Sequence, residues 1–342
     1  MPKDIQFRHI PYGSGRPQIV LAGNGLERSS GQIEWDKLLE KLAVQDDSGM
    51  TEEEKQAVMK EIEEMKDKIP FPLLYELISS PKPAPAHLGQ SDIDAQEKRL
   101  AEGLKELINA SNPLLDRLPS LGVDHIFTTN YSYCLEKAFL PSQDFSKTNV
   151  RSARRFNLNP ERKGNNKPKR EVQYRIHSGY QARNADGSPV GLWHIHGEAS
   201  VSRGVVLGAD RYGRMLSKIE QACAALSYDG NEPVTEPQPF ISWPELFLFG
   251  DLYIIGFGFE TCETDLWWLL RRKQRERFSD SRVYFYEAPD KTSVKQKLLL
   301  AHGAFIPCLT KDKPKTDADY QAFYELAFQD IQKRIEKAKS PS

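Results

Sequence analysis

Two glycine turns stand directly after apolar runs. In a parallel sheet, this is the place where a strand ends and its backbone can contact a ligand. QIVLA is followed by Gly23 and Gly25, and the run DLYII by Gly256 and Gly258. Because glycine has no Cβ, such a turn lets backbone N–H groups approach a phosphate closely. Each turn alone could equally be a plain strand-to-helix connection. Neither is a complete GxGxxG, and no GxxxxGK[ST] loop occurs, so a dehydrogenase is weakly supported and a P-loop ATPase is excluded. Two such turns in one sheet favour a dinucleotide ligand.

Two polar residues could act chemically on such a ligand. Asn130 ends the run DHIFTTN, and His196 lies in GLWHIHG. An amide can hold water or a hydroxyl group without adding charge, and an imidazole with a pKa near neutrality can accept a proton. Alternatively, Asn130 could cap the next helix and His196 could be a core histidine. His194 and His196 also form an HxH pair, but no carboxylate or cysteine at matching spacing completes a metal site, and we expect no metal.

Five sequence blocks stand in the order and approximate spacing of the sirtuin family, from about Gln18 to Pro307. They are AGNGLERSSGQIEWDKLL, FTTNY, HIHG, LGADRY and IIGFGFETCETDLWWLL. The chain most resembles the bacterial sirtuin-like NAD hydrolases of this family, and its insertions are unmatched. FTTNY and the HG pair after a strand are moderately specific for the family by themselves, whereas the five blocks in this order are strong evidence for the resemblance.

The resemblance implies a Rossmann-like NAD site. The pyrophosphate would lie on the first glycine turn, the nicotinamide ribose near Asn130 and His196, and the adenosine ribose and phosphates near the second turn. We therefore expect Asn130 to position ribose or water and His196 to act as general base. The residues of the matching blocks expected to bind NAD are Ala22, Gly23, Asn24, Gly25, Asp36, Thr129, Tyr131, Gly256, Phe257 and Gly258. Glu287, after YFY, could accept hydrogen bonds from ribose hydroxyls or simply face solvent.

Two departures from the family pattern bear on the reaction. Relatives commonly carry Asp two residues after the Asn, where this chain has Ser132, so one polar contact of the nicotinamide pocket is in doubt. Deacylases of the family usually carry a zinc domain with two Cys-x-x-Cys pairs, which help to frame a peptide groove. The four cysteines form no such pair; they are Cys134, Cys223, Cys262 and Cys308. Water is then the expected acceptor.

By resemblance, the expected function is hydrolysis of NAD to ADP-ribose and nicotinamide, in an effector that depletes NAD during anti-phage defence. One alternative is an NAD-dependent deacylase or ADP-ribosyltransferase that uses the same site. Another is a catalytically silent subunit that senses NAD or ADP-ribose or serves in assembly. The resemblance also implies a homo-oligomer and a separate partner ATPase or sensor protein, since unrestrained NAD hydrolysis would kill the host.

The elements that must position these residues alternate between strand and helix, which is typical of a doubly wound, mostly parallel α/β sheet. Strands are predicted over 18–22, within 124–131, over 172–178 and 191–197, at the start of 205–216, over 244–259 with its approaches, and within 281–290 and 304–309. Helices are predicted over 33–43, 52–68, 92–109, 264–278 and 317–339, and a further one ends on Gly303. Thr51 and Glu54 predict a capping box.

The length of 342 residues suits one elaborated domain. We expect an NAD-binding domain over 1–316, without a zinc ribbon and with a helical insertion at about 44–118 and a polar, basic insertion at about 141–190. A C-terminal helix and tail over 317–342 would follow.

Charge and apolar content limit the kinds of partner that the chain is expected to bind. Lys plus Arg number 47 and Asp plus Glu 48, so the net charge of −1 offers no global field for nucleic acid. Nucleic acid could bind only through the basic insertion, which could equally be a solvated loop or an interface with the acidic helix at 52–67. No segment reads as a signal peptide or a membrane span, and the cysteines are scattered, so we expect a cytoplasmic protein without membrane contact.

Overall fold

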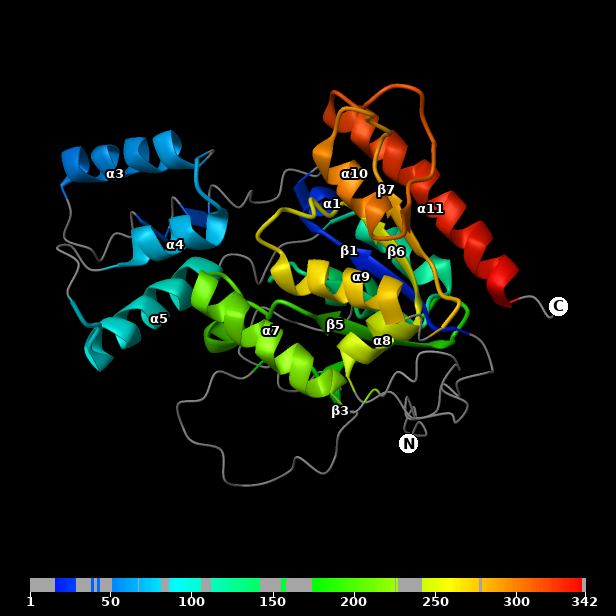
Figure 1. Ribbon diagram of the computed structural model, residues 1–342, viewed down its shortest axis with the longest axis horizontal. Coiled ribbons are helices and arrows are strands. Elements are labelled where there is room, and N and C mark those ends of the chain that lie inside the picture. Colours follow the sequence, from blue (N-terminus) through cyan, green and yellow to red (C-terminus); the bar gives the residue numbers. More distant parts are fainter. Residues whose placement is uncertain are drawn as a thin grey trace.

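An eight-stranded sheet forms the centre of the computed structural model (Figure 1). The structure describes residues 16–28, 38–39, 42–43, 51–66, 68–80, 86–105, 112–141, 155–157, 174–224, 226, 242–276 and 279–339. The strands are β1 (Gln18–Ala22), β2 (His125–Thr128), β3 (Arg155–Asn157), β4 (Ser178–Arg183), β5 (Pro189–His194), β6 (Asp251–Ile255), β7 (Val283–Tyr286) and β8 (Ala304–Phe305). Their order is β3-β4-β5-β2-β1-β6-β7-β8.

The six strands from β5 to β8 in this order pair in parallel, and β3 and β4 continue the sheet in antiparallel fashion. The central strand β1 has β2 on one side and β6 on the other. The chain first adds β2 to β5 on one side of β1, and then crosses over and adds β6, β7 and β8 on the other side. This reversal is the topological switch point at which open α/β sheets bind ligands. The predicted Rossmann-like, doubly wound fold is confirmed.

Both faces of the sheet are covered by apolar side chains, as a parallel sheet requires. Along β1, Val20 and Ala22 pack into one core and Ile19 and Leu21 into the other. This alternation explains why the four residues after Gln18 in QIVLA are all apolar, since each residue of the strand is buried. The strand β1 therefore has no side that faces solvent.

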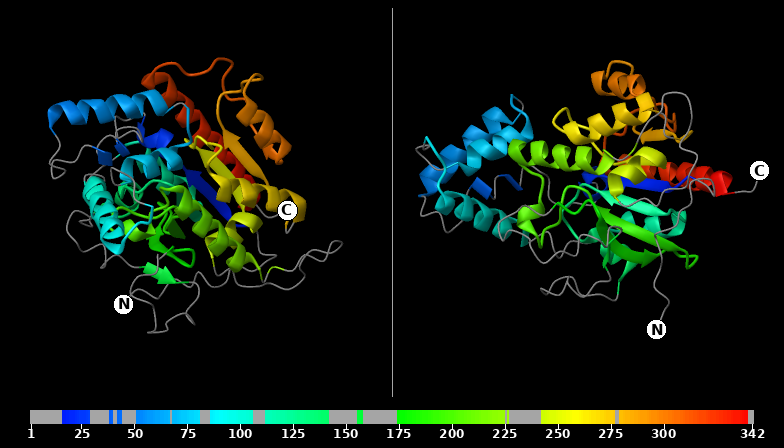
Figure 2. Two further views of the ribbon diagram at one scale, coloured as in Figure 1. Left: turned by 60° about the vertical axis from the view of Figure 1, so that its left-hand side comes forward. Right: turned by 60° about the horizontal axis from the view of Figure 1, so that its bottom comes forward.

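Helices cover the two faces and extend the molecule to one side. They are α1 (Asn24–Arg28), α3 (Glu52–Met65), α4 (Phe71–Ser79), α5 (Gln90–Leu104), α6 (Cys134–Phe139), α7 (Ala209–Cys223), α8 (Trp243–Phe249), α9 (Thr264–Glu276), α10 (Val294–Ala301) and α11 (Asp317–Lys339), with 3-10 turns η3 (Leu115–Leu121) and η6 (Ser202–Gly204). In Figures 1 and 2 the helices α3, α4 and α5 form a group beside the sheet. Thr51 and Glu54 form the predicted capping box of α3.

Three predicted elements differ from the structure. The strand predicted over 172–178 begins only at Ser178, because β4 is set by its hairpin with β5, whose turn is closed by Asn184 and Ser188. The strand predicted at the start of 205–216 is absent, and Val206 instead donates its N–H to the carbonyl of His196. The apolar approach from Pro244 is the helix α8, since a short buried helix and a buried strand have the same apolar pattern.

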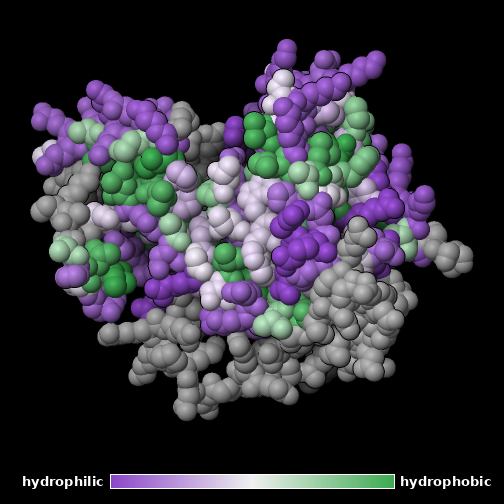
Figure 3. All heavy atoms as spheres, in the orientation of Figure 1, coloured by the Kyte–Doolittle hydropathy of each residue, from purple (hydrophilic) through white to green (hydrophobic). Residues whose placement is uncertain are grey.

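On the face shown in Figure 3, the described residues are mostly polar, with apolar side chains gathered over the α3 to α5 group and around α10. Among the described residues, no helix combines the length and apolar character that crossing a membrane requires. Of the range predicted as the basic insertion, about 141–190, the structure describes residue 141, β3 at 155–157 and residues 174–190.

Candidate functional site

A cavity of about 740 Å³ opens at the carboxyl ends of the central strands. Residues after β1, β2, β5, β6 and β7 contribute to its wall, so it lies at the switch point of the sheet. Of the predicted binding residues, those that line the cavity are Asn24, Gly25, Thr129, Tyr131, His196, Gly256, Phe257, Gly258 and Glu287. Its size falls within the range of about 300–1,000 Å³ that is usual for ligand pockets.

The two glycine turns pack directly against each other. Gly23 donates its N–H to the carbonyl of Ile255 at 3.0 Å, and Gly25 donates to that of Gly256 at 2.6 Å. A Cβ on Gly23 would lie 2.5 Å from the Gly256 oxygen, and one on Gly25 would lie 2.7 Å from the same atom. Glycine is thus required at both positions because the turns touch. Ala22 and Gly23 are not among the described residues of the cavity wall, and Asp36 lies outside the described residues.

The cavity wall carries cationic side chains that suit an anionic ligand. These are Arg28, Lys66, Lys68 and Lys313, which come from α1, the end of α3 and the segment before α11. Acidic residues also line the cavity; they are Glu260, Glu263 and Glu287. This mixture matches a ligand that combines phosphates with hydroxyl-rich sugars, since lysine and arginine bind phosphate oxygens and carboxylates accept hydrogen bonds from hydroxyls.

Asn130 lies just behind the cavity wall, between the lining residues Thr129 and Tyr131. Its side chain is buried, and its Nδ2 donates a hydrogen bond of 2.8 Å to Oε1 of Glu27 in α1. Its Oδ1 has no hydrogen-bond partner among the described residues. Asn130 does not cap α6, whose N-cap residue is Tyr133. The helix-cap alternative for Asn130 is therefore wrong.

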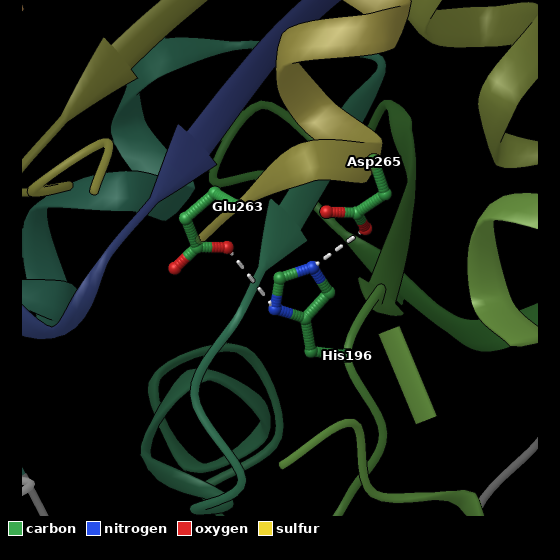
Figure 4. A group of neighbouring side chains, drawn as sticks. All are labelled: His196, Glu263 and Asp265. Carbon is green, nitrogen blue, oxygen red and sulfur yellow. Dashed lines mark hydrogen bonds and ion pairs between the residues drawn. The ribbon is translucent and has the colours of Figure 1, made fainter. Parts of the chain in front are cut away.

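His196 is buried on the cavity wall and held by two acids (Figure 4). Its Nε2 lies 2.9 Å from Oδ2 of Asp265, the second residue of α9, and its Nδ1 lies 3.7 Å from Oε2 of Glu263. The ring of Tyr212 meets the imidazole edge-to-face at 5.5 Å between centroids. A proton on Nε2 donated to Asp265 leaves Nδ1 as the nitrogen that can accept a proton.

The electrostatics of this group favour proton transfer. Burial alone would lower the pKa of His196, but the charge and hydrogen bond of Asp265 raise it above its ordinary value. Burial raises the pKa of Glu263 to about 7, with the nearby charge of His196 opposing that rise. Two groups whose pKa values are both raised therefore stand together on the cavity wall, an arrangement typical of acid–base sites.

The same three side chains also form a candidate metal cluster, since one ligand atom of each lies within 4.8 Å of the others. However, Glu263 and Asp265 face opposite ring nitrogens of His196. A single ion contacts only one imidazole nitrogen, so the three residues suit a hydrogen-bonded chain better than one coordination sphere. The cluster contains no cysteine.

The predicted HxH pair does not form a shared site. His194 turns away from His196: its Nδ1 lies 2.8 Å from the carbonyl oxygen of Asn130 and its Nε2 lies 2.8 Å from Oε1 of Glu136. Burial would lower the pKa of His194, but the charge of Glu136 and their hydrogen bond raise it to about 9. His194 therefore supports the backbone of Asn130 as a buried ion pair with Glu136.

Glu287 stands at the carboxyl end of β7, on the cavity wall. Its carboxylate accepts from Nζ of Lys295 at 2.6 Å and from Nε2 of Gln296 at 2.9 Å, both in α10. The side chain is 31% exposed, so it is neither sealed in the core nor directed only at bulk solvent. Both of its carboxylate oxygens thus accept hydrogen bonds within the protein, and its role as a ribose acceptor stays a prediction.

Sequence reasoning missed the acids that organise the site. The only feature of the sequence that could have pointed to Glu27 is its position in GNGLE, two residues after the first turn. For Glu263 it is the position in the block after the second turn. Asp265 stands in the same block, and its Oδ2 pairs with His196. In all three cases the partner lies far away in sequence, so only the folded chain brings the residues together.

Comparison with known families agrees with this geometry. The sequence matches the family described as SIR2-like domain over residues 124–307, from just before β2 to just after β8. This range is more than half of the chain and includes Asn130, His196 and the second glycine turn. No curated protein matches the chain. SIR2-like domains use NAD as a substrate, and the cavity has the position and lining for such a ligand. The chain belongs to the SIR2-like domain family.

Proposed function

We propose that this chain is an NAD glycohydrolase, which cleaves NAD to ADP-ribose and nicotinamide. The observation that carries the proposal is the cavity bounded by both glycine turns, with His196 on its wall and Asp265 fixing one of its ring nitrogens. The cavity has the size of NAD, and a basic group that can accept a proton lies on its wall. The absence of a Cys-x-x-Cys zinc domain in the sequence supports water as the acceptor.

In the proposed reaction, the bond between ribose C1′ and the nicotinamide nitrogen breaks, and nicotinamide leaves with the bonding electron pair. The ribose develops oxocarbenium character and a water molecule attacks C1′. Nδ1 of His196 accepts the proton that this water loses, and Asp265 stabilises the resulting imidazolium through Nε2. Asn130 positions the ribose or the water through its unpaired Oδ1.

The test is mass spectrometry of NAD, ADP-ribose and nicotinamide with the full chain and with Asn130→Ala and His196→Ala. We expect each variant to lower turnover by about 10²-fold or more. His87→Ala serves as a control, since His87 is exposed and lies outside the cavity wall. Turnover unchanged in both site variants would contradict the site assignment.

The products also separate the rival functions. Modified protein or O-acetyl-ADP-ribose with little free ADP-ribose would identify a transferase or deacylase. Tight binding of NAD without turnover, under every condition tested, would identify a sensing or assembly subunit.

We further propose that the activity serves anti-phage defence, in an oligomer gated by a partner ATPase or sensor protein. The support is the likeness of the sequence blocks to bacterial sirtuin-like NAD hydrolases. The same measurements in cells during infection test this role. NAD loss that depends on His196 and begins only after infection is expected, and NAD levels equal to those of the His196→Ala strain would overturn it.

A further inference from the structure

Glu27 is a buried carboxylate that the proposed reaction does not use. It lies in α1, directly after the first glycine turn, with only 6% of its surface exposed. Its Oε1 accepts hydrogen bonds of 2.8 Å from Nδ2 of Asn130 and 2.8 Å from Oγ of Ser132. A buried carboxylate is stable only when such donors satisfy it, so Glu27, Asn130 and Ser132 form one unit.

This unit fixes which end of the Asn130 amide faces Glu27 and which end points away from it. An amide has a donor end and an acceptor end, whereas a carboxylate only accepts. The structure places Nδ2 against Oε1 of Glu27, which leaves Oδ1 on the other side. Rotating the amide by 180° would set Oδ1 against the carboxylate oxygens of Glu27 and lose the hydrogen bond.

The backbone of Asn130 is fixed separately. Its N–H donates to Oγ1 of Thr128 at 3.1 Å, and its carbonyl oxygen lies 2.8 Å from Nδ1 of His194. These contacts hold the residue in place but leave the side-chain torsions free. Among the described residues, Glu27 is the one whose hydrogen bond orients the amide itself.

We propose that Glu27 is a positioning residue for Asn130, which presents Oδ1 as a fixed acceptor to a ribose hydroxyl or to the attacking water. The inference rests on the proposed NAD hydrolysis for its kinetic consequence, but the orientation of the amide is a property of the protein alone. It can therefore be tested with and without turnover.

The kinetic test compares Glu27→Gln with Glu27→Leu in the full chain. Glutamine keeps an acceptor oxygen for Nδ2 of Asn130, whereas leucine keeps the volume and cannot accept. We expect Glu27→Leu to lower kcat about 10- to 100-fold with KM for NAD changed less than about threefold, and Glu27→Gln to restore most of kcat. Equal losses in the two variants would overturn the proposal.

The matched control is Glu245→Leu. Glu245 in α8 is also 6% exposed and also accepts from a serine hydroxyl, Oγ of Ser242, but this partner is the N-cap residue of α8 and not a neighbour of Asn130. The Glu245→Leu variant shows how far the loss of a buried carboxylate elsewhere in the protein lowers kcat. A similar fall of kcat in Glu245→Leu would show that the effect of Glu27 is merely structural.

A second measurement does not depend on turnover. In protein labelled with ¹⁵N-asparagine, the side-chain NH₂ signals of Asn130 are assigned by their disappearance in Asn130→Ala. We expect Glu27→Leu to shift these signals and speed their exchange with water at least about tenfold, and Glu245→Leu to leave them unchanged. Unchanged Asn130 signals in Glu27→Leu would overturn the proposal, whereas lack of NAD cleavage by the wild type alone would overturn only the proposed function.

Discussion

At the scale of single residues, Asp265 determines how His196 can act. Its hydrogen bond to Nε2 fixes the tautomer with Nδ1 unprotonated, and its charge raises the pKa of the ring. A general base must be neutral before it accepts a proton, so activity should fall as the pH drops below this raised pKa. In the proposed reaction, Asp265 would therefore set both the orientation of the base and the pH at which it works.

Asp265→Asn should move the acid limb of the pH profile of kcat/KM to lower pH, because loss of the negative charge lowers the pKa of His196. The maximal rate should fall about 10- to 100-fold, since asparagine holds the ring less firmly. The measurement is kcat/KM from pH 5 to 9, with the exposed Asp210→Asn as control. An acid limb at the same pH in wild type and Asp265→Asn would contradict the assignment.

Glu287→Ala should raise KM for NAD about tenfold and leave kcat within about threefold. The carboxylate faces the cavity far along the sheet from His196, so it should bind ground state and transition state equally, and a hydrogen bond to a charged group contributes about 1.5–3 kcal/mol. Steady-state kinetics check this, with the solvent-facing Glu220→Ala as control. A loss confined to kcat would mean that Glu287 acts on the reacting bond.

At the scale of elements, the contact between the two glycine turns holds β1 and β6 together at the cavity. Gly25→Ala should destabilise the protein by about 1–3 kcal/mol, because its Cβ would lie 2.7 Å from the Gly256 oxygen and 2.8 Å from the Tyr324 hydroxyl. Gly213→Ala, exposed within α7 with open space around its Cβ, should instead stabilise by about 0.5–1 kcal/mol. Denaturant unfolding measures both; equal effects would refute the packing argument.

His194 joins β5 to α6 as a buried ion pair with Glu136. Its pKa of about 9 lies above the ordinary 6.5, so its contribution to stability is complete below pH 6.5 and disappears as the pH rises through 9. We expect the wild type to lose on the order of 2–4 kcal/mol relative to His194→Gln between pH 6 and 10. Parallel pH dependence of unfolding in wild type, His194→Gln and the exposed His87→Gln would refute the ion pair.

The elements also show why prediction from sequence succeeded and where it failed. β1, β2 and β6 were predicted because their short apolar runs are followed by glycine or asparagine, and β7 because the run VYFY is followed by the turn residues of EAPD. The helix α8 was mistaken for part of a strand, since every residue from Trp243 to Phe249 is buried and no polar face reveals the helical period. β4 was misplaced because its register depends on pairing with β5, which residues 172–178 do not encode.

At the scale of the whole molecule, the site depends on elements that lie far apart in the chain. Asn130 and His196 could be predicted because their types and the surrounding blocks indicate chemistry. Glu27, Glu263 and the pairing of Asp265 could not, since α1, β2, β5 and α9 meet only when the sheet has formed. The C-terminal helix α11 adds a further long-range contribution, because Tyr320, Phe323 and Tyr324 line the same cavity.

The helix α11 is therefore part of both the core and the site. It lies along the sheet in Figure 1 and buries Phe328, which is 1% exposed, in the core that also contains Val20 and Tyr253. Phe328→Ala should cost about 3–5 kcal/mol of unfolding free energy, whereas Leu326→Ala on the exposed side of α11 should cost less than about 0.5 kcal/mol. Because α11 also forms part of the cavity wall, Phe328→Ala should raise KM for NAD as well, and saturating NAD should recover part of the lost stability in thermal melts. A destabilised variant with unchanged KM and no response to NAD would show that α11 supports the core independently of the site.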